Sequence, residues 1–288
     1  MLLRLSRSIL GFVFLMMIFA FTAAEADAVT LVFVHGKGSS KPTIDDLRNN
    51  YWTVDMLRAS SRNNTVPVLL VNYDGRLRYW DAAADVSAQV NNYLNANPNE
   101  RLVFITHSYG GVIMRWILCN ADSTDPYFNY QGANYNRIQA ATSHVITLAG
   151  PHAGSEAANV AATLDSSILT GWILTLLDQN HPSTLILTTS NMSYANQNWL
   201  RDNLRSKGFY TVAGYGLFND FAHAEDYGCA AVSGVAGLPG EDDGLVAQYS
   251  AHQPGAPGLD WYNTEANHHH NRRNDYRKLG DIIATYGY

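Results

Sequence analysis

Thr106-His107-Ser108-Tyr109-Gly110-Gly111 is the segment of this 288-residue chain that decides the fold. It follows the apolar run 102–105, which is typical of a buried strand, and it precedes residues 112–117, whose apolar side chains recur at helical spacing. A serine on so tight a strand-to-helix turn needs small neighbours. Gly110 is one, whereas Thr106 is larger than the usual glycine. This turn would lift the Ser108 hydroxyl clear of the sheet at a helix N-terminus, so we expect Ser108 to act as a nucleophile.

The same alternation of strands and helices extends over the rest of the chain. Nearly unbroken apolar runs predict buried strands at 29–34, 66–71, 102–105, 144–148 and 208–214, with a weaker strand at 258–262. Helical periodicity predicts a helix after Asp81, which we expect to be its N-cap, and a last helix from Arg272. The pattern therefore predicts an α/β fold, with a mostly parallel sheet and helices on both faces.

Residues 155–206 interrupt this alternation. They contain an apolar helical pattern at 168–177, followed by segments rich in Gln and Asn. We interpret 155–206 as a lid-like insertion at the carboxyl ends of the strands, where ligand sites of open α/β sheets lie. An ordinary packed helix at 168–177 is the alternative.

Composition excludes several classes of protein. Apolar residues make up 47% of the chain and charged residues 15%, which excludes intrinsic disorder. The net charge of −6 argues against a nucleic-acid partner, because such a protein needs a basic face. The only cysteines, Cys119 and Cys229, cannot build a disulfide-rich scaffold or a cysteine-based zinc site, and whether they pair is open.

The N-terminus has the pattern of a signal peptide. Arg4 and Arg7 precede an apolar stretch at 9–21, and small residues follow with cleavage sites of the Ala-x-Ala type. We predict a signal peptide over residues 1–26 and a secreted domain, extracellular or periplasmic, over 27–288. An uncleaved signal anchor is the alternative. No later segment is apolar for long enough to predict a stable membrane anchor.

A glycine-rich loop follows the first strand. His35-Gly36-Lys37-Gly38 would let the backbone approach the nucleophile, so we predict an oxyanion hole made by the backbone N–H groups of Lys37 and Tyr109. A phosphate-binding loop is excluded, because the terminal Gly-Lys-Ser/Thr arrangement is missing.

At these motifs the chain resembles the α/β-hydrolase superfamily, and especially its secreted bacterial-type lipases and esterases. The His-Gly loop, the serine turn, the segment 150–155 and the segment 242–246 follow one another in the lipase order, over roughly residues 30–285. The resemblance implies a triad of serine, aspartate and histidine in that chain order.

The aspartate falls on Asp243, because lipases of this type carry the acid directly before Gly-Leu-Val; Glu241 and Asp242 are adjacent alternatives. The histidine must lie before the last helix, and an Asn-His pair points to His268, with His269 and His270 as alternatives. No metal site is expected at this triplet, since consecutive residues do not face one ligand position. The calcium ligand of some lipases is not carried over, because His270 occupies its position.

The resemblance thus implies a carboxylic ester hydrolase that forms an acyl-enzyme, takes an ester or lipid substrate and needs no cofactor. Acyltransferase, amidase and polyester depolymerase activities share the same fold and are alternatives. A non-catalytic binding module is the alternative from another class. The sequence leaves acyl-chain length and oligomeric state open.

Overall fold

The computed structural model describes residues 28–38, 40–123, 125, 134–163, 181–200, 207–216, 224–253, 261–264, 268, 269, 280, 281, 283 and 285. The predicted signal peptide, His270 and the apolar pattern at 168–177 lie outside these residues. So does most of the predicted C-terminal helix. None of the helices within the described ranges is both long enough and apolar enough to cross a bilayer.

Six strands form one sheet in the order β2-β1-β3-β4-β5-β6. Every pair of neighbouring strands is parallel. The strands are β1 (Val29–Val34), β2 (Val68–Val71), β3 (Arg101–His107), β4 (Thr142–Leu148), β5 (Gly208–Gly214) and β6 (Trp261–Thr264). A parallel pair cannot be joined by a tight hairpin, so each connection has to cross over a face of the sheet.

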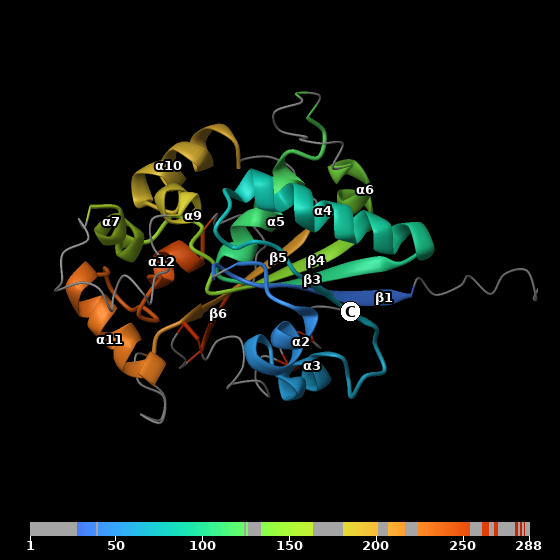
Figure 1. Ribbon diagram of the computed structural model, residues 1–288, viewed down its shortest axis with the longest axis horizontal. Coiled ribbons are helices and arrows are strands. Elements are labelled where there is room, and N and C mark those ends of the chain that lie inside the picture. Colours follow the sequence, from blue (N-terminus) through green and yellow to red (C-terminus); the bar gives the residue numbers. More distant parts are fainter. Residues whose placement is uncertain are drawn as a thin grey trace, which may run out of the picture.

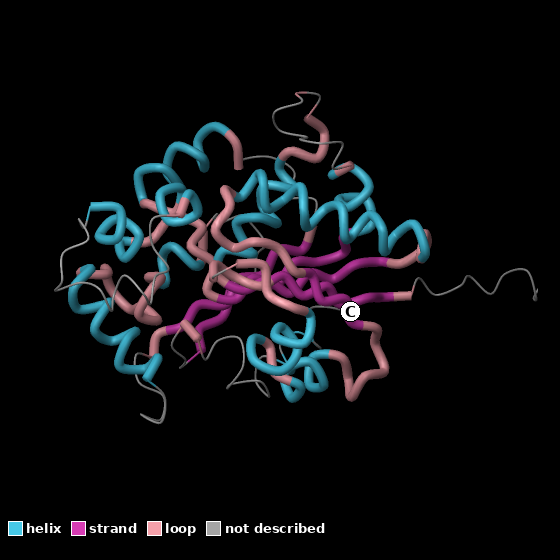
Figure 2. Tube along the Cα trace, in the orientation of Figure 1, coloured by secondary structure: helices cyan, strands magenta, loops and turns pink. Residues whose placement is uncertain are grey.

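Helices cover both faces of the sheet. One face carries α4 (Tyr79–Ala96), α5 (Tyr109–Cys119) and α6 (Tyr135–Ala141), and the other carries α2 (Ile44–Asp46), the π-helical turn η1 (Leu47–Tyr51) and α3 (Val54–Ser60) (Figure 1). Val32 and Val34 of β1 belong to the apolar cluster of the first face, whereas Leu31 and Phe33 belong to that of the second. The strands form a single layer between the helices (Figure 2). The predicted α/β class is therefore confirmed.

The start of α4 differs from the prediction. Asp81 is not the N-cap, because the helix begins at Tyr79 and the N-cap position is Arg78. The Tyr79 ring is buried against Trp116 of α5, with centroids 5.2 Å apart, and this packing extends the helix toward its N-terminus. Asp81 lies in the first turn, where its charge still favours the helix dipole.

The described parts of the predicted insertion form α7 (Glu156–Thr163), α9 (Pro182–Ile186) and α10 (Thr189–Asn198). In Figure 1 these helices gather at the carboxyl ends of the strands, together with α11 (Ala224–Ala236) and α12 (Gln248–Ala251). The described parts of the insertion, 155–163 and 181–200, therefore lie at the end of the sheet where Ser108 follows β3.

Arg115 of α5 connects the insertion to the core. Its guanidinium is fully buried and donates hydrogen bonds to the carbonyl oxygens of His152, at 3.1 Å, and Leu200, at 3.0 Å. Burial lowers the pKa of Arg115 to about 10, so the group stays charged at neutral pH. Two backbone carbonyls thus replace the carboxylate that a buried arginine usually meets.

The two cysteines lie on separate elements. Cys119 ends α5 and Cys229 lies within α11, and both are buried. No disulfide joins them among the described residues, so the pairing that the sequence left open is not formed.

Candidate active site

Ser108 sits on a strained turn between β3 and α5. Its backbone has φ 52° and ψ −124°, a conformation that side-chain-bearing residues rarely adopt. The Ser108 N–H donates to the carbonyl oxygen of Leu148 at 2.8 Å, which fixes the turn against the end of β4. Strain of this kind is stored at functional sites when the surroundings enforce it. The predicted strand-turn-helix geometry is present at Ser108.

The glycines after Ser108 allow α5 to start in contact with two strand ends. A Cβ on Gly110 would lie 2.5 Å from the carbonyl oxygens of Val34 and His35, and one on Gly111 would lie 2.5 Å from Thr147 Oγ1. Thr106, which replaces the usual glycine, is fully buried, and its hydroxyl lies 3.5 Å from the Ile146 carbonyl oxygen in β4. Close packing therefore requires small residues after Ser108, at the start of α5, but not at position 106 before it.

A buried acid–imidazole pair is formed by Asp243 and His268. Asp243 Oδ2 lies 3.0 Å from His268 Nδ1, and the backbone N–H of His268 donates to the Asp243 carbonyl oxygen at 2.9 Å. Asp243 Oδ1 accepts hydrogen bonds from the backbone N–H groups of Leu245 and Val246, at 3.0 and 2.8 Å. Both carboxylate oxygens are thereby fixed, which orients the imidazole ring.

The competing acid has a different set of contacts. Asp242 accepts hydrogen bonds from the Gly244 N–H and from the Ser233 hydroxyl, at 2.8 and 3.0 Å. Burial raises the pKa of Asp242. Asp242 therefore stabilises the turn itself, and of the two aspartates it is Asp243 that contacts His268.

The Asp243–His268 pair lies next to the serine turn. His107, which directly precedes Ser108, has its Nε2 atom 2.9 Å from the carbonyl oxygen of His268. The rings of His107 and His268 are 4.8 Å apart between centroids. His269 packs edge-on against His268 at 5.9 Å. The structure thus brings the predicted acid and the first histidine of the triplet to the turn that carries the serine.

The loop after β1 touches the serine directly. A Cβ on Gly36 would lie 2.8 Å from Ser108 Cβ, so only glycine fits at this contact. Lys37 follows Gly36 along the chain, and Tyr109 opens α5, where first-turn N–H groups have no acceptor within the helix. Both residues predicted to supply backbone N–H groups are therefore neighbours of this contact.

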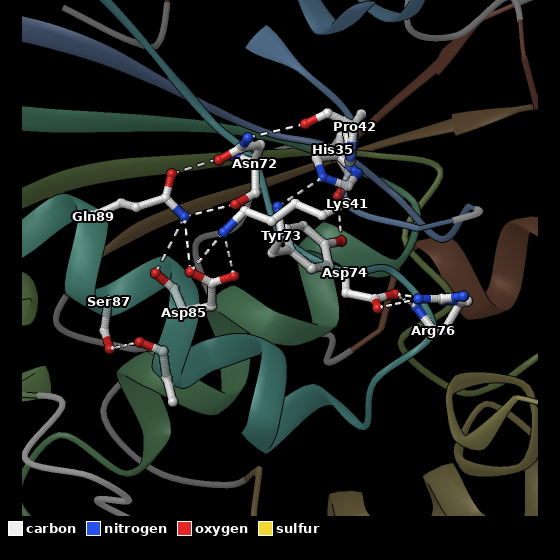
Figure 3. A network of polar contacts seen from close by, with 11 residues as sticks. His35, Lys41, Pro42, Asn72, Tyr73, Asp74, Arg76, Asp85, Ser87 and Gln89 are labelled. Carbon is white, nitrogen blue, oxygen red and sulfur yellow. Dashed lines mark hydrogen bonds and ion pairs between the residues drawn. The ribbon is translucent and has the colours of Figure 1, made fainter.

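His35 holds this loop in place rather than doing chemistry. Its ring stacks on Tyr73 at 4.1 Å between centroids, and its Nε2 accepts the Tyr73 backbone N–H at 3.2 Å. The Tyr73 hydroxyl returns a hydrogen bond to the His35 carbonyl oxygen at 2.6 Å (Figure 3). Burial raises the pKa of Tyr73 well above its ordinary value, so the hydroxyl keeps its proton as a donor.

The far end of the same loop is anchored to α4. Asn72 donates to the carbonyl oxygen of Pro42 at 2.9 Å, and its own backbone pairs with the amide of Gln89 (Figure 3). Lys41 forms an ion pair with Asp85 at 2.8 Å. Both ends of the loop between His35 and Pro42 are therefore fixed, which favours a preformed site.

The segment 150–155, quoted above only for its resemblance to lipases, braces the loop that carries the acid. The Ser155 hydroxyl donates to the Leu245 carbonyl oxygen at 2.5 Å, and the Ser250 hydroxyl donates to the Gly154 carbonyl oxygen at 2.5 Å. Burial lowers the pKa of His152 well below its ordinary value, so this histidine is neutral. Ser155 belongs to a motif of the sequence, whereas Ser250 is a supporting residue that no sequence pattern singles out.

The parallel sheet, with its serine between β3 and α5, has the architecture of the α/β-hydrolases. Residues 30–206 match the family described as "Putative serine esterase (DUF676)". The chain therefore belongs to this family, whose description is that of a serine esterase.

Solved structures of bacterial lipases and esterases share the fold. The mature lipase BlEst2 of Bacillus licheniformis superposes with a TM-score of 0.65 at 21% identity, covering 92% of this chain and 93% of that one. EstA from Clostridium botulinum gives 0.57 at 15%, covering 92% and 89%. Lipase 1 from Pelosinus fermentans gives 0.58 at 13%, covering 89% and 98%. No curated protein sequence matches the chain.

Proposed function

We propose that the protein is a secreted carboxylic ester hydrolase in which Ser108 is the nucleophile, His268 the general base and Asp243 the orienting acid. The observation that carries the proposal is the buried contact of 3.0 Å between Asp243 Oδ2 and His268 Nδ1, beside a serine turn of positive φ. Family membership supports the reaction class.

In this reaction His268 carries its proton on Nδ1 and donates a hydrogen bond to Asp243 Oδ2, so Nε2 is free to take the proton of Ser108. The Ser108 oxygen forms a bond to the ester carbonyl carbon, and the carbonyl oxygen becomes an oxyanion. Protonated His268 then gives its proton to the alcohol oxygen as the C–O bond breaks. Water repeats the sequence on the acyl-enzyme, which releases the acid and restores the hydroxyl of Ser108.

The backbone N–H groups of Lys37 and Tyr109 would stabilise the oxyanion. Supporting this assignment, Gly36 is packed against Ser108 and the loop is fixed at both ends. Donors that are already in place need no reorganisation during the reaction, and each is worth about 10²- to 10³-fold in rate.

The substrate would be an ester or lipid whose acyl chain reaches the insertion at 155–206. The insertion's described helices lie at the same end of the sheet as Ser108, which supports a cap over the acyl site. Export would follow from the signal peptide at 1–26, with its positive residues and apolar stretch.

The test is the hydrolysis of nitrophenyl esters from acetyl to long-chain acyl by the purified mature protein. Ser108→Ala should abolish turnover, while Ser87→Ala should keep it, because the Ser87 hydroxyl donates to the Ala84 carbonyl oxygen within α4. Adding an alcohol acceptor or an anilide to the same assay separates acyl transfer and amide cleavage from ester hydrolysis. Turnover that persists in Ser108→Ala would refute the proposal.

A further inference from the structure

Tyr51 lies on the face of the sheet opposite to α5 and contacts the loops of the candidate active site. Tyr51 ends the π-helical turn η1, and its hydroxyl oxygen accepts the backbone N–H of Gly36 at 2.6 Å. The same oxygen lies 2.5 Å from His107 Nδ1, and His107 Nε2 lies 2.9 Å from the His268 carbonyl oxygen. These contacts join positions that are 15, 56 and 161 residues apart along the chain.

With a neutral His107 ring, the chemistry of the partners fixes the direction of every hydrogen bond. A carbonyl oxygen can only accept, so Nε2 of His107 carries a proton and donates a hydrogen bond to the His268 carbonyl oxygen. In the neutral ring Nδ1 is then an acceptor, and the Tyr51 hydroxyl donates to it. The hydroxyl oxygen still has a lone pair for the Gly36 N–H. The hydrogen bonds therefore run one way, from Gly36 through Tyr51 and His107 to His268.

The two side chains in this chain of hydrogen bonds are held by packing. His107 is buried, and its ring lies edge-on to Trp52 and to Tyr51, at 6.3 and 5.7 Å between centroids. Trp52 in turn packs edge-on against Phe33 of β1 at 5.0 Å. Hydrogen bonds in such an environment are stronger than in water, and each polarises the next.

We propose that Tyr51 and His107 are positioning residues that hold three separate loops in register. The loops are the oxyanion loop at Gly36, the serine turn and the loop that carries His268. This inference rests on the proposed function. Neither side chain has to touch the substrate, because each acts through a backbone group next to a reacting residue. A displacement of about 1 Å at such a position costs about 10²-fold in rate.

Three substitutions remove the hydrogen bonds of Tyr51 and His107 in different combinations. Tyr51→Phe removes the hydroxyl and so breaks the links to Gly36 and to His107. His107→Gln places an amide near Nε2, which can still donate to His268, but loses the acceptor for Tyr51. His107→Asn places its oxygen near Nδ1, which can still accept from Tyr51, but loses the donor to His268.

The measurement is kcat and KM for a short-chain nitrophenyl ester, with the folded fraction checked by circular dichroism at the same temperature. Each of the three variants should lose about 10- to 100-fold in kcat, with KM within about threefold of wild type. Tyr51→Phe combined with His107→Gln should be no slower than Tyr51→Phe, because both changes break the same link. Tyr93→Phe is the matched control, since it also removes a hydroxyl hydrogen bond, to Thr30 at 2.7 Å, but at the amino end of β1.

Wild-type kcat in Tyr51→Phe, or losses that simply add in the double variant, would overturn the inference while leaving the proposed function intact if Ser108→Ala is inactive. A loss of activity that only follows a loss of folded protein would also overturn it. If Tyr51→Phe does not fold, the two His107 variants decide the matter by the same criteria. Activity that persists in Ser108→Ala would instead refute the proposed function.

Discussion

Replacing Asp243 with asparagine should invert the tautomer of His268 without disturbing the turn. The oxygen at Oδ1 accepts two backbone N–H groups, from Leu245 and Val246, and only an oxygen can do so. The new amide must therefore keep its oxygen there and place its NH2 group where Oδ2 now faces His268. His268 Nδ1 would then accept a hydrogen bond from this NH2 group instead of donating one, and Nε2 would carry the ring proton, which blocks its use as a base.

The size of the effect follows from this geometry. An inverted tautomer in a triad costs about 10⁴-fold in kcat, or about 5 kcal/mol of transition-state stabilisation. The two backbone hydrogen bonds survive, so the free energy of unfolding should change by about 1 kcal/mol or less. Activity and stability should thus separate widely in Asp243→Asn.

The assay compares kcat/KM for a short-chain nitrophenyl ester with the midpoint of urea unfolding. Asp242→Asn is the matched control, because it changes the neighbouring carboxylate, which bonds to Gly244 and Ser233 and not to His268. Asp242→Asn should keep activity within about tenfold of wild type. Near-wild-type activity in Asp243→Asn, or equal losses in the two variants, would refute the reasoning.

Three further outcomes are expected. His152 has a pKa well below the ordinary 6.5, chiefly because it is buried, so the unfolded chain binds the extra proton first. The free energy of unfolding should therefore decrease as pH falls below about 6.5, by up to about 1.4 kcal/mol per pH unit until the folded-state pKa is reached. Urea titrations of His152→Gln should show a flatter dependence on pH. Gly110→Ala should prevent folding or lower Tm steeply, since the added Cβ would meet two carbonyl oxygens. Gly234 lies on α11 with open space around its Cβ position, so Gly234→Ala should raise the free energy of unfolding by about 0.5–1 kcal/mol. A lower Tm in Gly234→Ala would count against the helix. Arg115→Met should destabilise the protein by about 3 kcal/mol in urea unfolding, because two charge-assisted hydrogen bonds are lost, and an unchanged midpoint would show that they contribute nothing net.

The sheet could be predicted because a strand buried on both faces is a continuous apolar run. β1 has the predicted bounds, and β5 does as well. β2 begins at Val68 rather than Val66, because the Val66 N–H bonds back to Ser61 and Pro67 has no N–H to offer a neighbouring strand. Such short-range competition is not visible in a hydrophobic pattern.

Helices were harder to predict where tertiary packing outweighs local preference. α11 (Ala224–Ala236) was not predicted, since its glycines weaken the helical signal. In the structure Val232 of α11 is buried against Ala157 of α7, a contact between segments far apart along the chain. The helix therefore depends on a partner that the local sequence does not reveal.

The same distinction applies to the site. Ser108, Asp243 and His268 stand in motifs of fixed order, so their neighbourhood could be predicted from the sequence. Tyr51 could not, because its partner His107 lies 56 residues away and a single long-range hydrogen bond leaves no periodic pattern. Supporting residues of this kind become visible only when the backbone has placed the loops together.

Covalent labelling of Ser108 tests the central claim most directly. A fluorophosphonate should react with the purified protein when the serine oxygen attacks phosphorus and fluoride leaves. Intact-mass analysis and peptide mapping should then find one adduct, on the peptide that carries Ser108, with esterase activity lost in proportion to labelling. Ser108→Ala should not be labelled at this peptide. An adduct on another residue, or full ester hydrolysis by completely labelled protein, would contradict the account.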